Sequence, residues 1–188
     1  MIHVKRLIGL TGKARSGKDT TAYILEQEHR FARHSFAFSL KQACKNIFGL
    51  SESQVNGALK EEYDSYWEKS PRQIMQLVGT ECLRVNFGET IWLQSLEKRV
   101  NLNPEQEFVV VSDVRFDNEA KWIRENGGVV WEIRRQDITE VSPHSSELGV
   151  DHSLIDSVIH NDSGLDSLMT KVKSEYELSF GEVLSADT

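Results

Sequence analysis

The chain has 188 residues, 39% hydrophobic and 27% charged, which is typical of one globular domain with an adequate core. Its net charge of −7 argues against a protein that coats nucleic acid through a broad basic face, although it does not exclude a small anionic ligand. No stretch approaches the roughly 20 apolar residues that span a membrane. Cys44 and Cys82 lie far apart without metal-ligand spacing, so we expect a cytoplasmic protein in a reducing compartment.

Strands and helices are predicted to alternate at the start of the chain. The apolar run 5–11 indicates a buried strand, and residues 18–30 have helical spacing. A second short strand is expected over 31–38. The next helix, over 39–48, is expected to cover one apolar face, formed by Leu40, Ala43, Cys44 and Ile47.

The middle of the chain, from about 50 to 104, looks helical throughout. Ser51 and Ser70 are expected N-caps, and Pro71 stands at a favoured first helical position. At about 100° per residue, a helix over 71–85 has an apolar side with Ile74, Val78, Cys82 and Val85. Four polar residues form a separate stripe because they step by four: Arg72, Gln76, Thr80 and Arg84.

The second half of the chain alternates again, starting with the β-branched run 108–113, its clearest buried strand. The remaining expected elements are a helix over 117–125, a strand over 129–134, a polar loop over 136–153, a strand over 157–160 and a helix over 165–178. Strands separated by helices predict an α/β doubly wound domain, with a parallel sheet covered on both faces. The helical block between the second and third strands is too long for a plain crossover and predicts a lid or substrate-binding insertion.

The stretch LIGLTGKARSGKDTT, residues 7–21, runs from the first expected strand through a loop into the first expected helix. Gly12, Gly17 and Lys18 fit the phosphate-binding pattern Gly-x-x-x-x-Gly-Lys, in which backbone N–H groups and a helix start cradle phosphates. An ordinary glycine turn is the alternative. The expected nucleotide-binding residues are Gly12, Lys13, Ala14, Arg15, Ser16, Gly17, Lys18, Asp19 and Thr20.

Asp19 occupies the position where Ser or Thr normally binds magnesium. Its carboxylate either contacts the metal or only favours the positive end of the helix, and the sequence leaves both open. Magnesium would then be held mainly through water and phosphate, with Thr20 and Asp113 as its protein ligands.

Several charged residues are candidates for the reaction itself. Asp113 ends the strongest strand, where ligands bind in open α/β sheets, although it could also start a loop. Arg115 could reach a phosphate or form an ion pair with Asp117 or Glu119. Asn118 and Glu119 are expected to act at the start of the helix and not in catalysis. Arg134 could stabilise a transferring group or simply pair with neighbouring acids, Glu132 or Asp137.

The polar stripe on the predicted helix over 71–85 has two interpretations. Its two arginines and two hydrogen-bonding side chains could clamp a monophosphate, because Arg makes forked contacts to phosphate. The alternative is a solvated helix face. Lys41 could approach the monophosphate or be an ordinary solvated lysine. Trp92 could contact the deoxynucleoside or pack in the core. His144 and His152 do not predict a zinc site because no third ligand has suitable spacing.

Seven segments, distributed over most of the chain, carry a family resemblance. They are GLTGKARSGKDT at 9–20, FAFSLK at 36–41, PRQIMQLVGTECLR at 71–84, SDVRFDNEA at 112–120, NGGVVWEIRR at 126–135, HSSE at 144–147 and VIHNDSG at 158–164. In them the chain resembles the deoxynucleoside monophosphate kinases of bacteriophages. The last segment is also similar to dephospho-coenzyme A kinase, a relative of that family.

The resemblance implies one P-loop kinase domain over 1–188, with a helical monophosphate-binding insertion at about 39–104 and a lid loop at about 135–153. It implies transfer of the ATP γ-phosphate to a deoxynucleoside monophosphate with Mg²⁺, and it makes Asp19 no departure from the family. The implied catalytic residues are Lys18, Asp113, Arg115 and Arg134. The implied acceptor-binding residues are Lys41, Arg72, Gln76, Thr80, Arg84, Trp92 and Arg115; His144 and Glu147 match a family loop without a chemical role.

Two other functions remain open from the sequence. A dephospho-coenzyme A kinase or another small-metabolite kinase would phosphorylate a hydroxyl and need a carboxylate base, which Asp19 could supply. A nucleotide-dependent switch would need no arginines at an acceptor pocket. Neither a nucleic-acid polymer nor a membrane is an expected partner, and both a monomer and a homodimer are compatible with the sequence.

Overall fold

The computed structural model describes residues 2–136 and 149–181. The chain divides into two compact units. The first contains Met1–Ser35 and Arg99–Thr188, and the second contains Phe36–Lys98.

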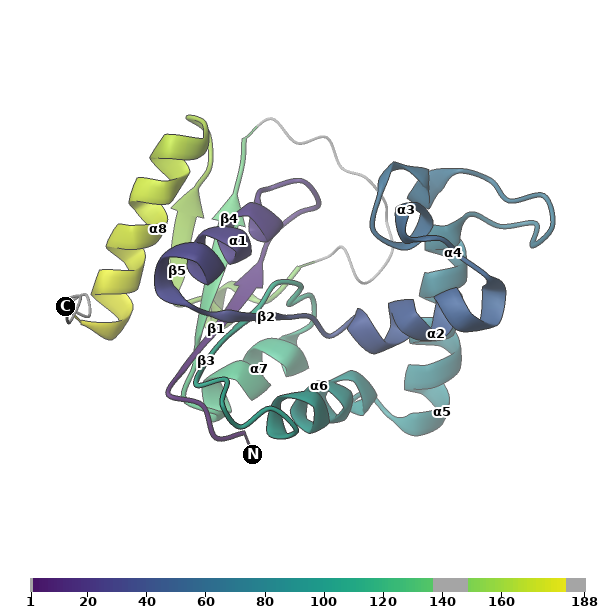
Figure 1. Ribbon diagram of the computed structural model, residues 1–188, viewed down its shortest axis with the longest axis horizontal. Coiled ribbons are helices and arrows are strands. Elements are labelled where there is room, and N and C mark those ends of the chain that lie inside the picture. The colour runs from purple at the N-terminus through teal and green to yellow at the C-terminus, as the bar shows by residue number, and fades with distance from the viewer. Residues whose placement is uncertain (1, 137–148, 182–188) are drawn as a thin grey trace. The chain divides into compact units, whose positions relative to one another are not determined.

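The first unit is built on a five-stranded parallel sheet (Figure 1). Its strands are β1 (Arg6–Thr11), β2 (Ala32–His34), β3 (Phe108–Val111), β4 (Val129–Arg134) and β5 (Ser157–His160), in the order β2-β3-β1-β4-β5. The apolar runs in β1, β3 and β4 become the three central strands, because such strands are buried on both faces. The predicted α/β doubly wound sheet is confirmed.

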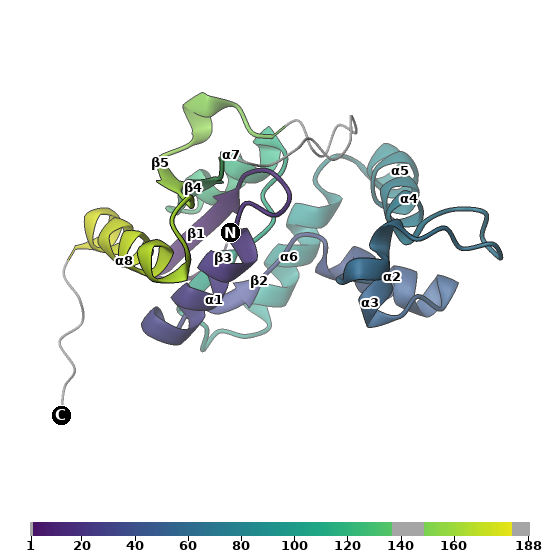
Figure 2. The same ribbon diagram turned by 90° about the horizontal axis from the view of Figure 1, so that it is seen from above.

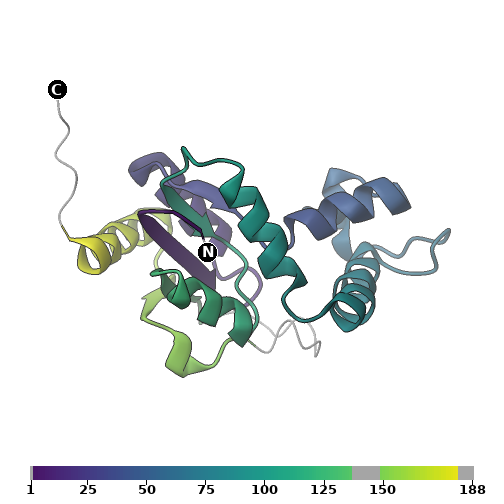
Figure 3. The same ribbon diagram turned by 90° about the horizontal axis from the view of Figure 1, so that it is seen from below.

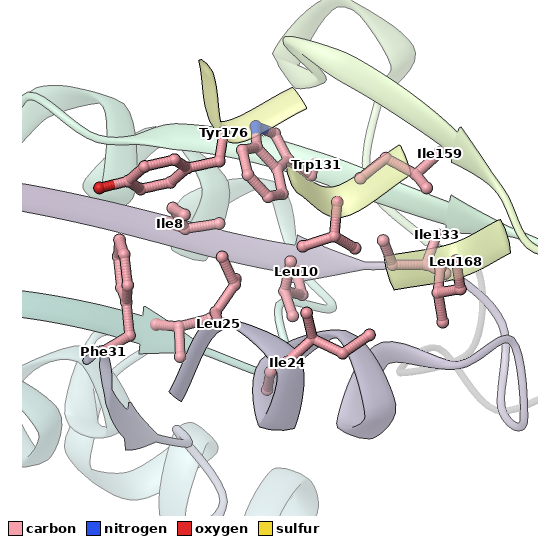
Figure 4. Packing of buried hydrophobic residues seen from close by; sticks show 13 residues of the cluster. Ile8, Leu10, Ile24, Leu25, Phe31, Trp131, Ile133, Ile159, Leu168 and Tyr176 are labelled. Atoms are coloured by element: carbon pink, nitrogen blue, oxygen red, sulfur yellow. The ribbon is translucent and has the colours of Figure 1, made fainter. Parts of the chain in front are cut away.

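Helices cover both faces of this sheet. Helices α1 (Lys18–His29) and α8 (Leu165–Phe180) lie on one face, and α7 (Asp117–Glu125) lies on the other (Figures 2 and 3). Figure 4 shows side chains of the sheet meeting those of α1 and α8 in the larger core. This core contains Ile8, Leu10, Ile24, Leu25, Phe31, Trp131, Ile133, Ile159, Leu168 and Tyr176, among others.

The second unit consists of short helices. They are α2 (Phe38–Phe48), α3 (Glu52–Val55), the 3-10 helix η1 (Ala58–Glu61), α4 (Pro71–Gln76), the π-helix η2 (Leu77–Arg84), α5 (Val85–Phe87) and most of α6 (Ile91–Asn101). Both predicted N-caps are confirmed. Ser51 caps α3 and Ser70 caps α4, each in a reciprocal capping box with the glutamine three residues later.

Three expectations for the second unit are wrong. The region 50–104 is not helical throughout: Asp64 accepts hydrogen bonds from the N–H groups of Tyr66 and Trp67, a local turn that competes with a helix. This turn closes an isolated bridge between Asp64 and Lys69. The expected apolar face of α2 also fails at Ile47, whose side chain is exposed, because the small core of this unit gathers around Cys44 instead.

The third correction concerns the helix expected over 71–85, which changes to π geometry at Leu77. Its i→i+5 hydrogen bonds put more residues in each turn than an α-helix has. Accordingly Ile74, Gly79 and Arg84, five residues apart, are all buried. The α-helical spacing put Cys82 and Val85 on the apolar side, but both are exposed.

Within the described ranges, none of the helices has the length and the apolar content to cross a bilayer.

Candidate active site

Residues 12–17 form the loop that connects β1 to α1, and two positions of this loop require glycine. Gly12 has φ +130° and Gly17 has φ +110°, a region that residues with a Cβ rarely adopt. A Cβ on Gly12 would lie 2.3 Å from the carbonyl oxygen of Ile133, and one on Gly17 would lie 2.4 Å from Nδ2 of Asn161. The loop therefore packs against the ends of β4 and β5 with no space for a side chain at these positions.

Asn161 fixes this packing, and sequence reasoning did not single it out. Its Nδ2 donates to the carbonyl oxygen of Ser16 at 2.8 Å. Its backbone N–H donates to the carbonyl oxygen of Arg134, also at 2.8 Å. The loop is thus tied to β4 and β5. The available signal was an asparagine directly after the last strand, in the VIHNDSG segment.

The loop offers several hydrogen-bond donors near the start of α1. Lys18 Nζ donates to the carbonyl oxygens of Gly12 and Lys13, each at 2.7 Å. Among the described residues, no side chain caps the N-terminus of α1, and the buried Ser16 Oγ has no hydrogen-bond partner. Uncapped N–H groups at a helix start, a hydroxyl and an ammonium together suit an anion such as phosphate.

A pocket of about 140 Å³ lies beside the loop, within the first unit. It brings together two predicted catalytic residues, Lys18 and Arg115, and adds Glu132, which sequence reasoning considered only as an ion-pair partner of Arg134. Its lining is Thr11, Gly12, Lys13, Lys18, Val114, Arg115, Glu132, Gly149, Val150 and Ile155.

Arg134 binds Glu132 through two contacts. Its Nη2 lies 2.5 Å from Oε2 of Glu132, and its Nε lies 3.3 Å from Oε1. The ion pair that the sequence left open is therefore present; its Glu132 lines the pocket, whereas Arg134 does not belong to the lining.

The predicted metal ligands, Thr20 and Asp113, do not line this pocket. Thr20 and Asp19 are exposed in the first turn of α1. Asp113 follows β3 and interacts with Arg99, whose Nη2 donates to the carbonyl oxygen of Ser35 at 2.6 Å. Burial lowers the pKa of Arg99, and the charge of Asp113 partly offsets that shift.

Glu119 has the helix-start role that the sequence predicted. Its buried carboxylate accepts the backbone N–H groups of Arg115 at 2.8 Å and of Phe116 at 3.1 Å. These bonds fix the backbone that carries Arg115 into the pocket.

No three His, Cys, Asp or Glu side chains gather as a metal site in residues 2–136 and 149–181. His144 and Glu147, and most of the predicted lid loop 135–153, lie outside the described residues.

The second unit holds the remaining predicted residues. Arg72 on α4 forms an ion pair with Glu61. Gln76, also on α4, has a buried Nε2 with no partner among the described residues. In η2, Thr80 is half-buried, while the Arg84 side chain is only 4% exposed and pairs with Glu89 at 3.2 Å.

Lys41 and Trp92 lie elsewhere in this unit. Lys41 is half-buried on α2. The indole N–H of Trp92, on α6, donates to the carbonyl oxygen of Gly79 at 3.1 Å, and the ring is buried. The structure thus gives Trp92 a hydrogen bond to the π-helix.

Comparison with solved structures shows the fold of the chain. Dephospho-CoA kinase from Campylobacter jejuni superposes with a TM-score of 0.51 at 17% identity, covering 95% of this chain and 99% of that one. The parallel sheet and its helices therefore have the same fold as that structure.

Comparison of sequences shows the family. The sequence model described as "Deoxynucleotide monophosphate kinase" matches residues 53–172. A provisionally named deoxynucleotide monophosphate kinase of Acanthamoeba polyphaga mimivirus is 38% identical over 159 residues, which cover 76% of this chain and 80% of the relative. The "Deoxynucleoside-5'-monophosphate kinase" of Escherichia phage T5 is 32% identical over 111 residues, 55% of this chain and 44% of that protein. The chain belongs to the deoxynucleotide monophosphate kinase family.

Proposed function

We propose that this chain transfers the γ-phosphoryl group of ATP to the phosphate of a deoxynucleoside monophosphate, releasing a deoxynucleoside diphosphate and ADP. Family membership makes it an ATP-dependent phosphotransferase acting on nucleoside monophosphates. The observation that carries the proposal is the glycine loop, which joins β1 to the uncapped start of α1 beside a pocket that contains Lys18 and Arg115.

The loop suits the phosphates of ATP. The positive φ angles of Gly12 and Gly17 let the loop curl, so that its backbone N–H groups can converge on a phosphate. The unpartnered hydroxyl of Ser16 is a further donor. Lys18, bound to two loop carbonyls, lies where its charge would offset that of the β- and γ-phosphates.

Magnesium fits this site through water and phosphate more than through a protein cage, since the described residues hold no cluster of three ligating side chains. Asp113 and the hydroxyl of Thr20 are the side chains proposed to hold it. When bound, it supplies positive charge that neutralises the phosphate oxygens.

The acceptor requires no general base. The phosphate oxygen of a nucleoside monophosphate is already ionised near pH 7, and transfer depends on positioning and charge stabilisation. Arg115, in the pocket, and Arg134, paired with Glu132 of the pocket lining, would supply that charge beside Lys18.

The monophosphate is proposed to bind residues of the second unit. Arg72, Gln76, Thr80 and Arg84 supply guanidinium, amide and hydroxyl donors, which match a phosphate and its sugar. The unpartnered Nε2 of Gln76 supports this proposal, as does the π-helix, because π segments occur frequently at functional sites. Lys41 is proposed to approach the same phosphate, and Trp92 to lie near the nucleoside.

A cytoplasmic location is proposed as well, supported by two cysteines that form no disulfide.

Release of ADP from MgATP, measured with each deoxynucleoside monophosphate in turn, tests the proposed activity. We expect turnover with at least one of them and none with dephospho-coenzyme A. Turnover with dephospho-coenzyme A alone would instead support a kinase that phosphorylates a hydroxyl, and Asp19→Asn would then abolish it. Hydrolysis of ATP that no acceptor accelerates would contradict both activities and support a nucleotide-dependent switch.

Arg72→Ala tests the acceptor side separately. It should raise the KM for the deoxynucleoside monophosphate and leave the KM for ATP unchanged. Arg33→Ala is the matched control, since Arg33 is also an arginine in an ion pair, with Glu26 at 3.5 Å, but lies on β2 in the first unit. Unchanged kinetics in Arg72→Ala would remove Arg72 from the acceptor site.

A further inference from the structure

Glu132 and Arg134 project from one face of β4. They lie at the carboxyl end of this strand, on the same side of the sheet as the end of β1 that leads into the glycine loop. They are two residues apart in a strand, so their side chains point to the same side. The sheet register puts Glu132 beside Thr11, the last residue of β1 before the loop. Position in the strand therefore brings this carboxylate next to the phosphate site.

The carboxylate is the more enclosed member of the pair. The Glu132 side chain is 19% exposed and the Arg134 side chain 47%. Glu132 shares the pocket lining with Lys18 and Arg115, while both of its oxygens contact the Arg134 guanidinium. Its charge is thus flanked by cationic groups.

A carboxylate beside a polyphosphate repels it unless another interaction offsets the repulsion. Here the two contacts from Arg134 supply that offset. A two-point contact also fixes the plane of the guanidinium, which a single contact does not. Glu132 engages two of the five N–H donors of Arg134, which leaves three for another anion.

We propose that Glu132 is a positioning residue that holds the Arg134 guanidinium at the phosphate pocket for the transferring phosphoryl group. The proposal rests on the proposed kinase activity. Glu132 acts through Arg134 and itself binds neither phosphate nor metal. A misplaced guanidinium costs rate, because stabilisation of the transition state depends on donors that are already in place.

A double-mutant cycle with Glu132→Ala and Arg134→Ala tests this role. With saturating MgATP and monophosphate, Glu132→Ala should lower kcat roughly 10- to 100-fold. It should leave both KM values and the magnesium concentration for half-maximal rate unchanged. In the Arg134→Ala background, the same change should cause no further loss of kcat, because the group that Glu132 orients is gone.

Two further variants serve as controls. Glu132→Gln keeps the size of the side chain and one acceptor oxygen, so it should fold normally and lose less activity than Glu132→Ala. Glu107→Ala removes the same charge from an exposed ion pair with Lys5, at 2.8 Å and outside the pocket lining, and should keep full activity.

Three results would overturn the role. Equal losses from Glu132→Ala with and without Arg134 would show that Glu132 acts independently. A raised magnesium requirement would indicate a metal ligand, and wild-type kcat in both Glu132 variants would show no role. These outcomes require that the wild type phosphorylates a monophosphate in the same assay; an inactive wild type would remove the proposed function and this role together.

Discussion

Lys18 makes two short hydrogen bonds to carbonyl oxygens of the loop that carries it. The ammonium group is thereby held over the loop by Gly12 and Lys13, and its charge stays where phosphate is proposed to bind. A phosphate is a stronger acceptor than a neutral carbonyl because it is ionised, so Lys18 can exchange these bonds for charge-assisted ones.

The surroundings of Asp19 bear on which of its two possible roles, helix start or contact with magnesium, is favoured. It is exposed in the first turn of α1, and no side chain of the described residues caps that helix. A negative charge there is stabilised by the positive end of the helix dipole. This placement favours a helix-start role, and contact with magnesium stays a prediction.

The two cysteines should differ in reactivity. Cys44 is fully buried, and burial raises the pKa of its thiol to about 11, so little thiolate forms at pH 8. Cys82 is exposed. We expect iodoacetamide at pH 8 to modify Cys82 in the native protein and Cys44 only after unfolding, as peptide mass mapping would show. Cys82→Ser should abolish the fast labelling, and rapid labelling of native Cys44 would contradict the buried position.

At the scale of elements, helices and strands were predicted most accurately where the hydrophobic pattern of the sequence has the periodicity of the element that forms. The helix over 117–125 and the strands over 129–134 and 157–160 have the predicted bounds. The Gly127-Gly128 pair stops the helix, and β-branched residues occur in both strands. The glycine loop between β1 and α1 was equally predictable, because glycines, strand and helix are contiguous in the chain; its binding of phosphate stays a prediction.

The π-helix η2 could not be predicted in the same way. Nothing in its sequence specifies a wider turn, which is seen only in the structure, as burial at steps of five from Ile74 to Gly79 to Arg84. The contact of Asn161 with the loop and the place of Glu132 in the pocket lining escaped prediction as well. Both depend on contacts between distant segments, since Asn161 binds a loop 145 residues earlier and Glu132 borders the same loop.

The capping box of α4 should stabilise the second unit. Ser70 Oγ accepts the N–H of Gln73, and Gln73 Oε1 accepts the N–H of Ser70 at 2.8 Å. Ser70→Ala should therefore lower the free energy of unfolding by about 1 kcal/mol, measured in urea. It should also raise the KM for the monophosphate, because α4 carries Arg72 and Gln76.

Ser51→Ala is the matched control, since Ser51 forms the same box on α3, which carries no proposed acceptor residue. It should lower stability without changing the KM for the monophosphate. An unfolding free energy that stays at the wild-type value in Ser70→Ala would contradict the stabilising role of the cap.

At the scale of the whole molecule, two histidines make stability depend on pH. Burial lowers the pKa of His29 and of His34 below the usual 6.5. The unfolded chain then binds more protons than the folded protein between the two pKa values. The stability from these neutral histidines is complete above about pH 6.5 and is lost as the pH falls through their folded pKa values.

We therefore expect the free energy of unfolding, measured in urea, to fall between pH 7 and pH 5.5. A variant with His29→Gln and His34→Gln should show a flatter profile over the same range, because neither residue then takes up a proton. Identical profiles for the wild type and this variant would assign the pH dependence to other groups.

The central claim is that the glycine loop serves phosphoryl transfer to a deoxynucleoside monophosphate. Chromatographic measurement of the deoxynucleoside diphosphate, in wild type and in Lys18→Ala, tests it most directly. The wild type should form one diphosphate for each ADP with at least one of the monophosphates, and Lys18→Ala should lower that rate roughly 100- to 1,000-fold. Absence of diphosphate with every monophosphate, or an unchanged rate in Lys18→Ala, would contradict the claim.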